Sequence, residues 1–109
     1  MATDKLNEKR IKQRFSVNLK STGNLEGQEQ QFLISNLSAT GARLHFETKA
    51  TVKIGMSIAL SITIPNTVLR VQTEANVMWV TRQGNAISLG IKFKEPLSDT
   101  MVQQLIKKD

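Results

Sequence analysis

Alternation of apolar and polar residues is the feature of this chain that most restricts its fold. From residue 15 onward the alternation recurs in one short segment after another. Successive side chains of a β-strand point to opposite faces, so a segment with a period of two has one buried and one solvated face. In the clearest example, Met56, Ile58, Leu60, Ile62 and Ile64 alternate with residues that are small or polar. The sequence therefore predicts a domain built mainly from β-strands.

Turn signals divide the alternating region into about six strands. We expect a turn at residues 23–27, a second strand at 30–37, a fifth strand at about 68–81 and a turn at 83–85. The apolar centre of the second strand, at residues 32–34, predicts burial on both faces. The inward-facing residues predicted for the first, third and last strands are Phe15, Val17, Leu19, Ala42, Leu44, Phe46, Ile87, Leu89, Ile91 and Phe93.

The same alternation predicts the environment of two further residues. Trp79 shares a phase with Val77 and Ala75, so we expect its ring in the core. His45, the only histidine, falls on the exposed phase of the third strand. We expect a solvated side chain there rather than a catalytic base. Neither residue is therefore assigned to a functional site.

The period changes at the C-terminus. Pro96 ends the last strand, and Ser98 has the side chain of a helix N-cap. Leu97 and Val102 have the spacing of a hydrophobic staple around that cap. The apolar stripe of the predicted helix comprises Met101, Val102, Leu105 and Ile106.

Together these elements predict an all-β fold. We expect a six-stranded antiparallel β-barrel of the Greek-key type with a short C-terminal α-helix. Closing a small barrel requires strong bends at glycines or bulges. Gly41, Gly55 and Gly90 are the candidates for these bends.

Positive charge is concentrated at the N-terminus. The chain has a net charge of +6, and residues 1–20 contain six basic and two acidic residues. A local cluster of this kind attracts phosphate groups. We therefore divide the chain into a flexible basic arm at residues 1–14 and a barrel with its terminal helix at residues 15–109.

The composition and motifs of the chain exclude several classes of protein. No apolar run approaches the roughly 20 residues that span a bilayer, and the polar N-terminus lacks the features of a signal peptide. The absence of cysteine excludes disulfides and thiolate chemistry and fits a cytoplasmic protein. No catalytic set, metal-spaced cluster or Gly-rich phosphate loop is present. We expect no enzymatic activity, no catalytic or metal-binding residues, no cofactor and no membrane insertion.

The basic arm carries an R-x-x-x-R motif, formed by Arg10 and Arg14. A guanidinium can bridge O6 and N7 of guanine with two parallel hydrogen bonds, and it also pairs with phosphodiester oxygens. Two arginines four residues apart therefore suit a ligand that holds guanines and phosphates close together. By itself, the motif is equally typical of a solvated basic tail.

A second motif, N-x-S-x-x-G, follows the second predicted strand. The side chains of Asn36 and Ser38 can hydrogen-bond either the backbone or a ligand. Gly41 has no Cβ, which permits a positive φ or a close approach. By itself, this motif is typical of an ordinary turn.

In this order, and ahead of a small β-domain, the two motifs resemble the ligand signature of the PilZ family. The resemblance extends to the segments at residues 41–44, 77–80 and 90–93. It implies a bacterial receptor for the second messenger cyclic di-GMP that signals through a protein partner. Arg10 and Arg14 would grip guanine and phosphate, Asn36 and Ser38 would hydrogen-bond the ligand, and Gly41 would shape the turn.

The resemblance also suggests secondary candidates and one departure. Lys9 and Arg43 are secondary ligand-binding candidates, and a basic residue at the position of Lys9 is associated with a stacked ligand pair. Asn36 stands where many members carry Asp, whose carboxylate accepts two guanine N–H groups. We therefore expect weaker binding than with Asp. The number of ligand molecules per site and the oligomeric state stay open.

Two alternatives to a receptor also stay open at this point. One is a basic barrel that binds single-stranded nucleic acid, which would require exposed aromatic residues for base stacking. The four phenylalanines instead fall on predicted core phases. The other is a protein-interaction module that has lost its ligand.

Overall fold

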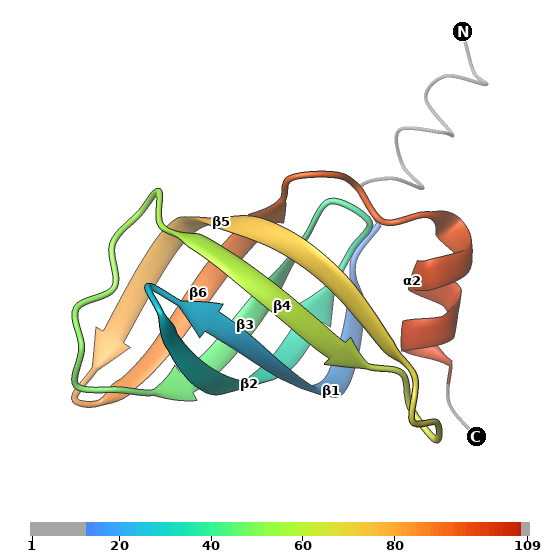
Figure 1. Ribbon diagram of the computed structural model, residues 1–109. Coiled ribbons are helices and arrows are strands. Elements are labelled where there is room, and N and C mark those ends of the chain that lie inside the picture. The colour runs from blue at the N-terminus through green and yellow to red at the C-terminus, as the bar shows by residue number, and fades with distance from the viewer. Residues whose placement is uncertain (1–12, 108–109) are drawn as a thin grey trace, which may run out of the picture.

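The computed structural model describes residues 13–107, which form a closed antiparallel barrel with a helix at one end (Figure 1). The order of strands around the barrel is β1-β2-β3-β6-β5-β4, and β1 pairs with β4 to close it. This arrangement confirms the predicted fold class. The elements are β1 (Phe15–Leu25), β2 (Gln28–Leu37), β3 (Gly41–Glu47), β4 (Ser57–Thr63), β5 (Arg70–Gln83), β6 (Ala86–Phe93) and α2 (Asp99–Ile106).

The inner faces of the six strands form one apolar core, as the alternation predicts. All the inward-facing residues predicted for β3 and β6 are buried. In β1, Leu19 is buried, whereas Phe15 and Val17 pack partly buried against the core. Phe32 and Phe46 contact edge to face, with ring centroids 4.7 Å apart. Among residues 13–107, no helix combines the length and the apolar character needed to cross a membrane.

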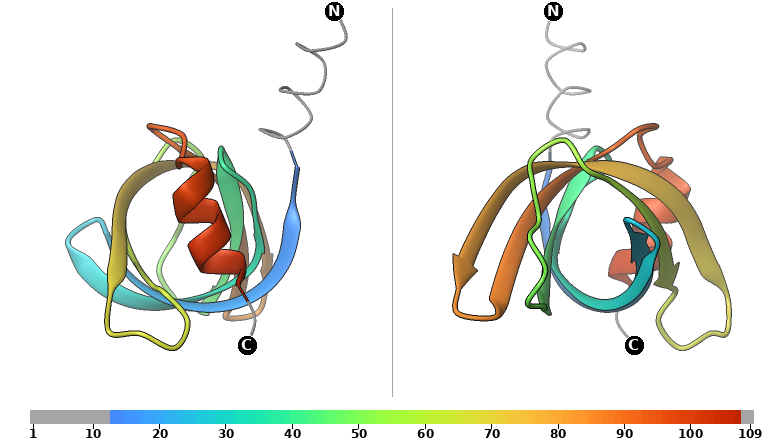
Figure 2. Two further views of the ribbon diagram at one scale, coloured as in Figure 1. Left: turned by 90° about the vertical axis from the view of Figure 1, so that its right-hand side faces the viewer. Right: turned by 60° about the vertical axis from the view of Figure 1, so that its left-hand side comes forward.

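Helix α2 covers one open end of the barrel (Figure 2). The Ser98 hydroxyl accepts a hydrogen bond of 3.2 Å from the backbone N–H of Met101, which confirms the predicted N-cap. Leu97 and Val102, on either side of the cap, are both buried and have the predicted staple spacing. The apolar stripe is only partly covered, because Met101 is 41% exposed.

Three predictions about the strands were wrong in detail. Residues 23–25 continue β1, and the turn consists of Glu26 and Gly27, both with positive φ. Gly23 lies between two paired strands, where a Cβ would come within 2.8 Å of the Phe32 ring. Leu33 is 43% exposed, because a strand in this barrel has only one buried face. Strand β5 begins two residues later and ends two residues later than predicted.

The strand pairing contains three register shifts, one of which lies between Ser16 and Leu19 in β1 and leaves the burial of β1 alternating. The other two are β-bulges that interrupt the alternation of their strands. The pairing of β2 with β3 steps from Ile34↔Leu44 to Asn36↔Arg43, so Ser35 is an extra residue. The pairing of β5 with β6 steps from Val77↔Ile91 to Trp79↔Gly90, so Met78 is an extra residue. Each bulge reverses the inward and outward positions of the residues that follow it in the same strand.

The second bulge overturns the prediction for Trp79. If the alternation were regular through Met78, Trp79 would share the inward phase of Val77. In the structure, Trp79 is 36% exposed and lies on the outer face of the barrel. Val80 takes the inward position instead and is half-buried against the core. The first bulge acts in the same way on Asn36, which lies outward while Leu37 returns to the core.

Candidate functional site

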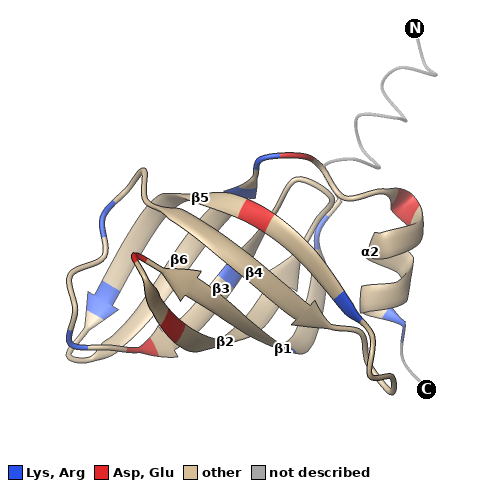
Figure 3. Cartoon of the chain, in the orientation of Figure 1, with Lys and Arg blue, Asp and Glu red and all other residues tan. Residues whose placement is uncertain are grey.

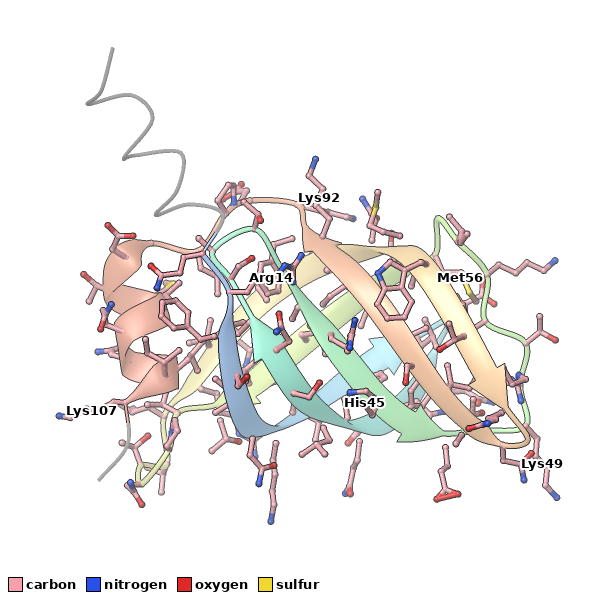
Figure 4. All side chains as sticks on the ribbon, turned by 180° about the vertical axis from the view of Figure 1, so that it is seen from behind. Arg14, His45, Lys49, Met56, Lys92 and Lys107 are labelled. Carbon is pink, nitrogen blue, oxygen red and sulfur yellow. The ribbon has the colours of Figure 1, made fainter. Side chains whose placement is uncertain are left out.

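A groove of about 490 Å³ lies over the outer face of β3 and β6, between the two bulges. Figure 4 looks onto this face, with Arg14 and Lys92 labelled beside it. Residues on both flanks of the groove follow a bulge, so the two phase shifts supply side chains that a regular barrel would bury. The groove is lined by Arg14, Asn36, Thr40, Gly41, Ala42, Arg43, Met78, Trp79, Gly90, Ile91 and Lys92.

One side of the groove joins the two sequence motifs. Arg14 Nη1 donates a hydrogen bond of 3.0 Å to Oδ1 of Asn36. Arg14 is exposed just before β1, and Asn36 is half-buried near the end of β2. Because arginine carries only donors, the Asn36 amide directs its oxygen toward Arg14. One acceptor site of the single Asn36 oxygen is thus already occupied by the guanidinium.

The other side of the groove is aromatic and cationic. The guanidinium carbon of Arg43 lies 5.3 Å from the centroid of the Trp79 ring, within the range of a cation–π contact. The ring lies over Gly90, where a Cβ would overlap the indole. The glycine thereby provides the space in which the indole lies against β6. Arg43 and Trp79 therefore supply a planar guanidinium and a planar indole to the lining of the groove.

The turn of residues 38–41 forms one end of the groove. Ser38 is 1% exposed, and its hydroxyl accepts hydrogen bonds from the backbone N–H groups of Gly41, at 3.2 Å, and Thr40, at 3.3 Å. The Ser38 N–H donates to the Gly41 carbonyl at 2.9 Å. The Ser38 side chain is therefore directed into the turn and is not part of the groove lining.

Backbone contacts attach this turn to the end of β6 and to the segment before α2. The N–H of Phe93 donates to the Thr40 carbonyl at 2.8 Å, and the N–H of Leu97 donates to the Ala39 carbonyl at 2.7 Å. At Gly41, a Cβ would overlap the Ile91 carbonyl. Glycine is thus required here because β3 and β6 approach closely.

Positive charge dominates the groove. Arg14, Arg43 and Lys92 contribute three cations, and the described residues that line the groove include no Asp or Glu. Figure 3 shows how the basic and acidic residues are distributed over the barrel. A concave surface with cations, a flat aromatic ring and small residues suits an anion that carries planar rings.

The structure brings most of the predicted site residues together. Arg14, Asn36, Gly41 and the secondary candidate Arg43 line one groove, and Ser38 lies beneath it in the turn. Lys9 and Arg10 lie outside the described residues. The predictions missed seven lining residues, of which Met78, Trp79 and Lys92 have large or charged side chains. Lys92 and Met78 could have been found from their outward phases beside Ile91 and Val77, whereas the position of Trp79 depends on the bulge.

Comparisons with known proteins identify the family. The PilZ domain family matches residues 8–108. The structure resembles the Bacillus subtilis inhibitor of motility MotI/DgrA, with a TM-score of 0.67 and 21% identity over 84% of this chain and 46% of that one. It also resembles the PilZ domain of Escherichia coli YcgR solved with cyclic di-GMP, with a TM-score of 0.65 and 20% identity over 85% and 82% of the two chains.

A third similar structure is the Borreliella burgdorferi PlzA protein in complex with cyclic di-GMP, with a TM-score of 0.60 and 19% identity over 95% of this chain and 43% of that one. The chain therefore spans less than half the length of the Bacillus and Borreliella proteins. A search of curated proteins gave no significant match. The structural likenesses show a shared fold, and the family match covers nearly the whole sequence. The chain belongs to the PilZ domain family.

Proposed function

We propose that this PilZ domain is a receptor that binds cyclic di-GMP in the groove over β3 and β6. The observation that carries the proposal is the contact between Arg14 of the first motif and Asn36 of the second motif at the edge of one cationic groove. Two proteins of the same fold, E. coli YcgR and B. burgdorferi PlzA, were solved with this ligand.

The chemistry of the groove matches the chemistry of the ligand. Cyclic di-GMP contains two guanines and two phosphodiesters, so it combines planar bases with negative charge. The Arg14 guanidinium can bridge the O6 and N7 atoms of a guanine or pair with a phosphodiester. Trp79 and Arg43 offer a surface on which a base can stack. Lys92 contributes a compact positive charge for phosphate.

The remaining predicted residues complete the proposal. Arg10 acts together with Arg14 on guanine and phosphate, and Lys9 adds positive charge beside them. Ser38 contributes by holding the turn that presents Gly41, since its hydroxyl is bonded within that turn. The protein acts in the cytoplasm, without catalysis. Binding orders the arm at residues 1–14 and creates a surface for a downstream protein partner.

Calorimetric titration with cyclic di-GMP tests the proposal, with GTP and single-stranded DNA as control ligands. We expect selective binding of cyclic di-GMP to the wild type and at least a tenfold loss in the Arg10→Ala/Arg14→Ala variant. Trp79 is the only tryptophan, so its fluorescence provides a second readout from within the groove. Equal binding of DNA and cyclic di-GMP would instead support a nucleic-acid-binding barrel, and unchanged binding by the double variant would exclude the assigned site.

A further inference from the structure

A half-buried histidine links three strands beside the groove. His45 lies on the outer face of β3, two residues along the strand from Arg43, and is labelled in Figure 4. Its Nε2 atom is 2.7 Å from Oγ of Ser35 in β2, and its Nδ1 atom is 2.8 Å from Oγ of Ser88 in β6. We call these three side chains the histidine row. The solvated environment predicted for His45 was wrong, because both ring nitrogens have protein partners.

The hydrogen bonds of the histidine row are mutually compatible. A neutral imidazole donates a hydrogen bond at one nitrogen and accepts one at the other, and a serine hydroxyl can do either. In both tautomers, one serine therefore donates to the ring and the other accepts from it. All three side chains are half-buried, so their hydrogen bonds are only partly exposed to competition from water.

One end of the row lies at the bulge that turns Asn36 outward. Ser35 is the extra residue of β2, and an extra residue is not held by a pair in the neighbouring strand. The hydrogen bond from the Ser35 side chain to His45 attaches the bulge to β3. Loss of the bulge would return Asn36 to the inward phase and break its hydrogen bond with Arg14.

The other end of the row lies in the strand that faces the second bulge. Ser88 pairs directly with His45 across β3 and β6, and it stands two residues before Gly90. Gly90 in turn is paired with Trp79 after the bulge at Met78. The histidine row therefore crosses the strands between the two flanks of the groove and contacts the Asn36 flank directly.

We propose that His45 is a positioning residue of the ligand site. By holding Ser35, it keeps the β2 bulge in one register and so keeps Asn36 turned toward Arg14. His45 itself does not line the groove. The proposal rests on the proposed function for the identity of the ligand, whereas its effect on Asn36 is a property of the ligand-free protein.

Two substitutions separate hydrogen bonding from packing at this position. His45→Phe keeps a planar ring but removes both hydrogen bonds, and His45→Gln keeps one donor group and one acceptor. We expect the Kd for cyclic di-GMP to rise about three- to tenfold in His45→Phe, which is the range expected for loss of the one hydrogen bond that holds Ser35. In His45→Gln, the Kd should stay within about twofold of the wild-type value. The opposite order of the two variants would show that packing alone matters and would overturn the proposal.

A matched control is available on the neighbouring strand. Thr81 is exposed on β5 beside Ser88, and its hydroxyl takes part in neither hydrogen bond of the histidine row. Thr81→Ala therefore removes a nearby hydroxyl and leaves both of those hydrogen bonds in place. We expect this variant to bind cyclic di-GMP as the wild type does. Ser35→Ala, which deletes only a hydroxyl, should reproduce the loss seen in His45→Phe and decides the outcome if the Phe variant does not fold.

A measurement without ligand separates this proposal from the proposed function. In ¹⁵N-correlated NMR spectra, the side-chain amide of Asn36 should shift in His45→Phe and in Ser35→Ala but not in Thr81→Ala. Unchanged Asn36 resonances in both row variants would overturn the positioning role, even if cyclic di-GMP binds. Absence of cyclic di-GMP binding by the wild type would instead defeat the proposed function and leave the NMR result decisive for His45.

Discussion

Arg14 and Asn36 are 22 residues apart in the sequence and are joined by a hydrogen bond of 3.0 Å at the edge of the groove. Arg14 immediately precedes β1, and Asn36 is paired with Ser16 across β1 and β2. The antiparallel pairing of these two strands therefore brings the two motifs together. The contact also gives the amide of Asn36 a defined orientation before any ligand binds.

The single acceptor oxygen of Asn36 predicts the effect of Asn36→Asp. A carboxylate has two oxygens, so one can pair with Arg14 while the other accepts a guanine N–H in a charge-assisted hydrogen bond. We expect the affinity for cyclic di-GMP to increase about three- to tenfold, measured by calorimetry. Asn18→Asp, at an exposed position of β1, is the control for added negative charge. An affinity no higher than that of the wild type would refute the role given to the amide.

The close contact between Gly90 and Trp79 predicts that a side chain at position 90 would disturb the groove. A methyl group at this position would overlap the indole of Trp79, so Gly90→Ala should displace the ring from its place over β6. We expect a change in Trp79 fluorescence in the free protein and a loss of at least about fivefold in affinity. Gly27→Ala also places a methyl group on a glycine and strains the turn between β1 and β2, because Gly27 has a φ of +83°, but nothing lies within 4 Å of the added methyl group. Its Trp79 spectrum should match the wild type, and a matching spectrum for Gly90→Ala would contradict the prediction.

The position of Lys92 at the groove predicts that its contribution to ligand binding depends on ionic strength. The residue is exposed at the groove, so Lys92→Gln should weaken binding of the anionic ligand at low salt by about three- to tenfold. Screening should reduce this difference as salt is raised toward 1 M, where the Debye length is about 3 Å. Lys20→Gln, an exposed lysine of β1 outside the groove, removes the same charge and should have a smaller effect. Equal losses in the two variants would indicate only a general effect of net charge.

The hydrogen bonds of Arg82 predict that this residue stabilises the fold without contributing to ligand binding. Its guanidinium donates to the carbonyls of Thr48 and Gly84, each at 3.1 Å, and to the carbonyl of Ala50. These bonds attach the loop between β3 and β4 to the end of β5. Arg82→Ala should lower the free energy of unfolding by about 1 kcal/mol, given the exposure of the bonds, and lower Tm by several degrees.

Arg70→Ala is the matched control for Arg82→Ala, because Arg70 is exposed at the opposite end of the same strand. Thermal unfolding should distinguish the two variants, and both should bind cyclic di-GMP as the wild type does, since neither residue lines the groove. Equal Tm values for Arg82→Ala and Arg70→Ala would show that the loop does not depend on Arg82.

Predictions that depended on regular alternation were mostly correct, and those that crossed a bulge failed. The apolar phases of β3, β4 and β6 predicted their buried residues, because a period of two holds for as long as the pairing is regular. Trp79 was assigned to the core because its phase was counted from Val77. The extra residue at Met78 is visible only in the pairing of β5 with β6.

The sequence by itself determined the barrel, the terminal helix with its Ser98 cap and the identity of the two motifs, because each depends on local spacing and side-chain chemistry. Only the tertiary structure decided which side chains share the groove. That outcome depends on the register of neighbouring strands, and two single-residue bulges turn Asn36 and Trp79 outward. Register is set by contacts between segments far apart in the chain, such as Gly90 beneath Trp79, and local alternation carries no information about them.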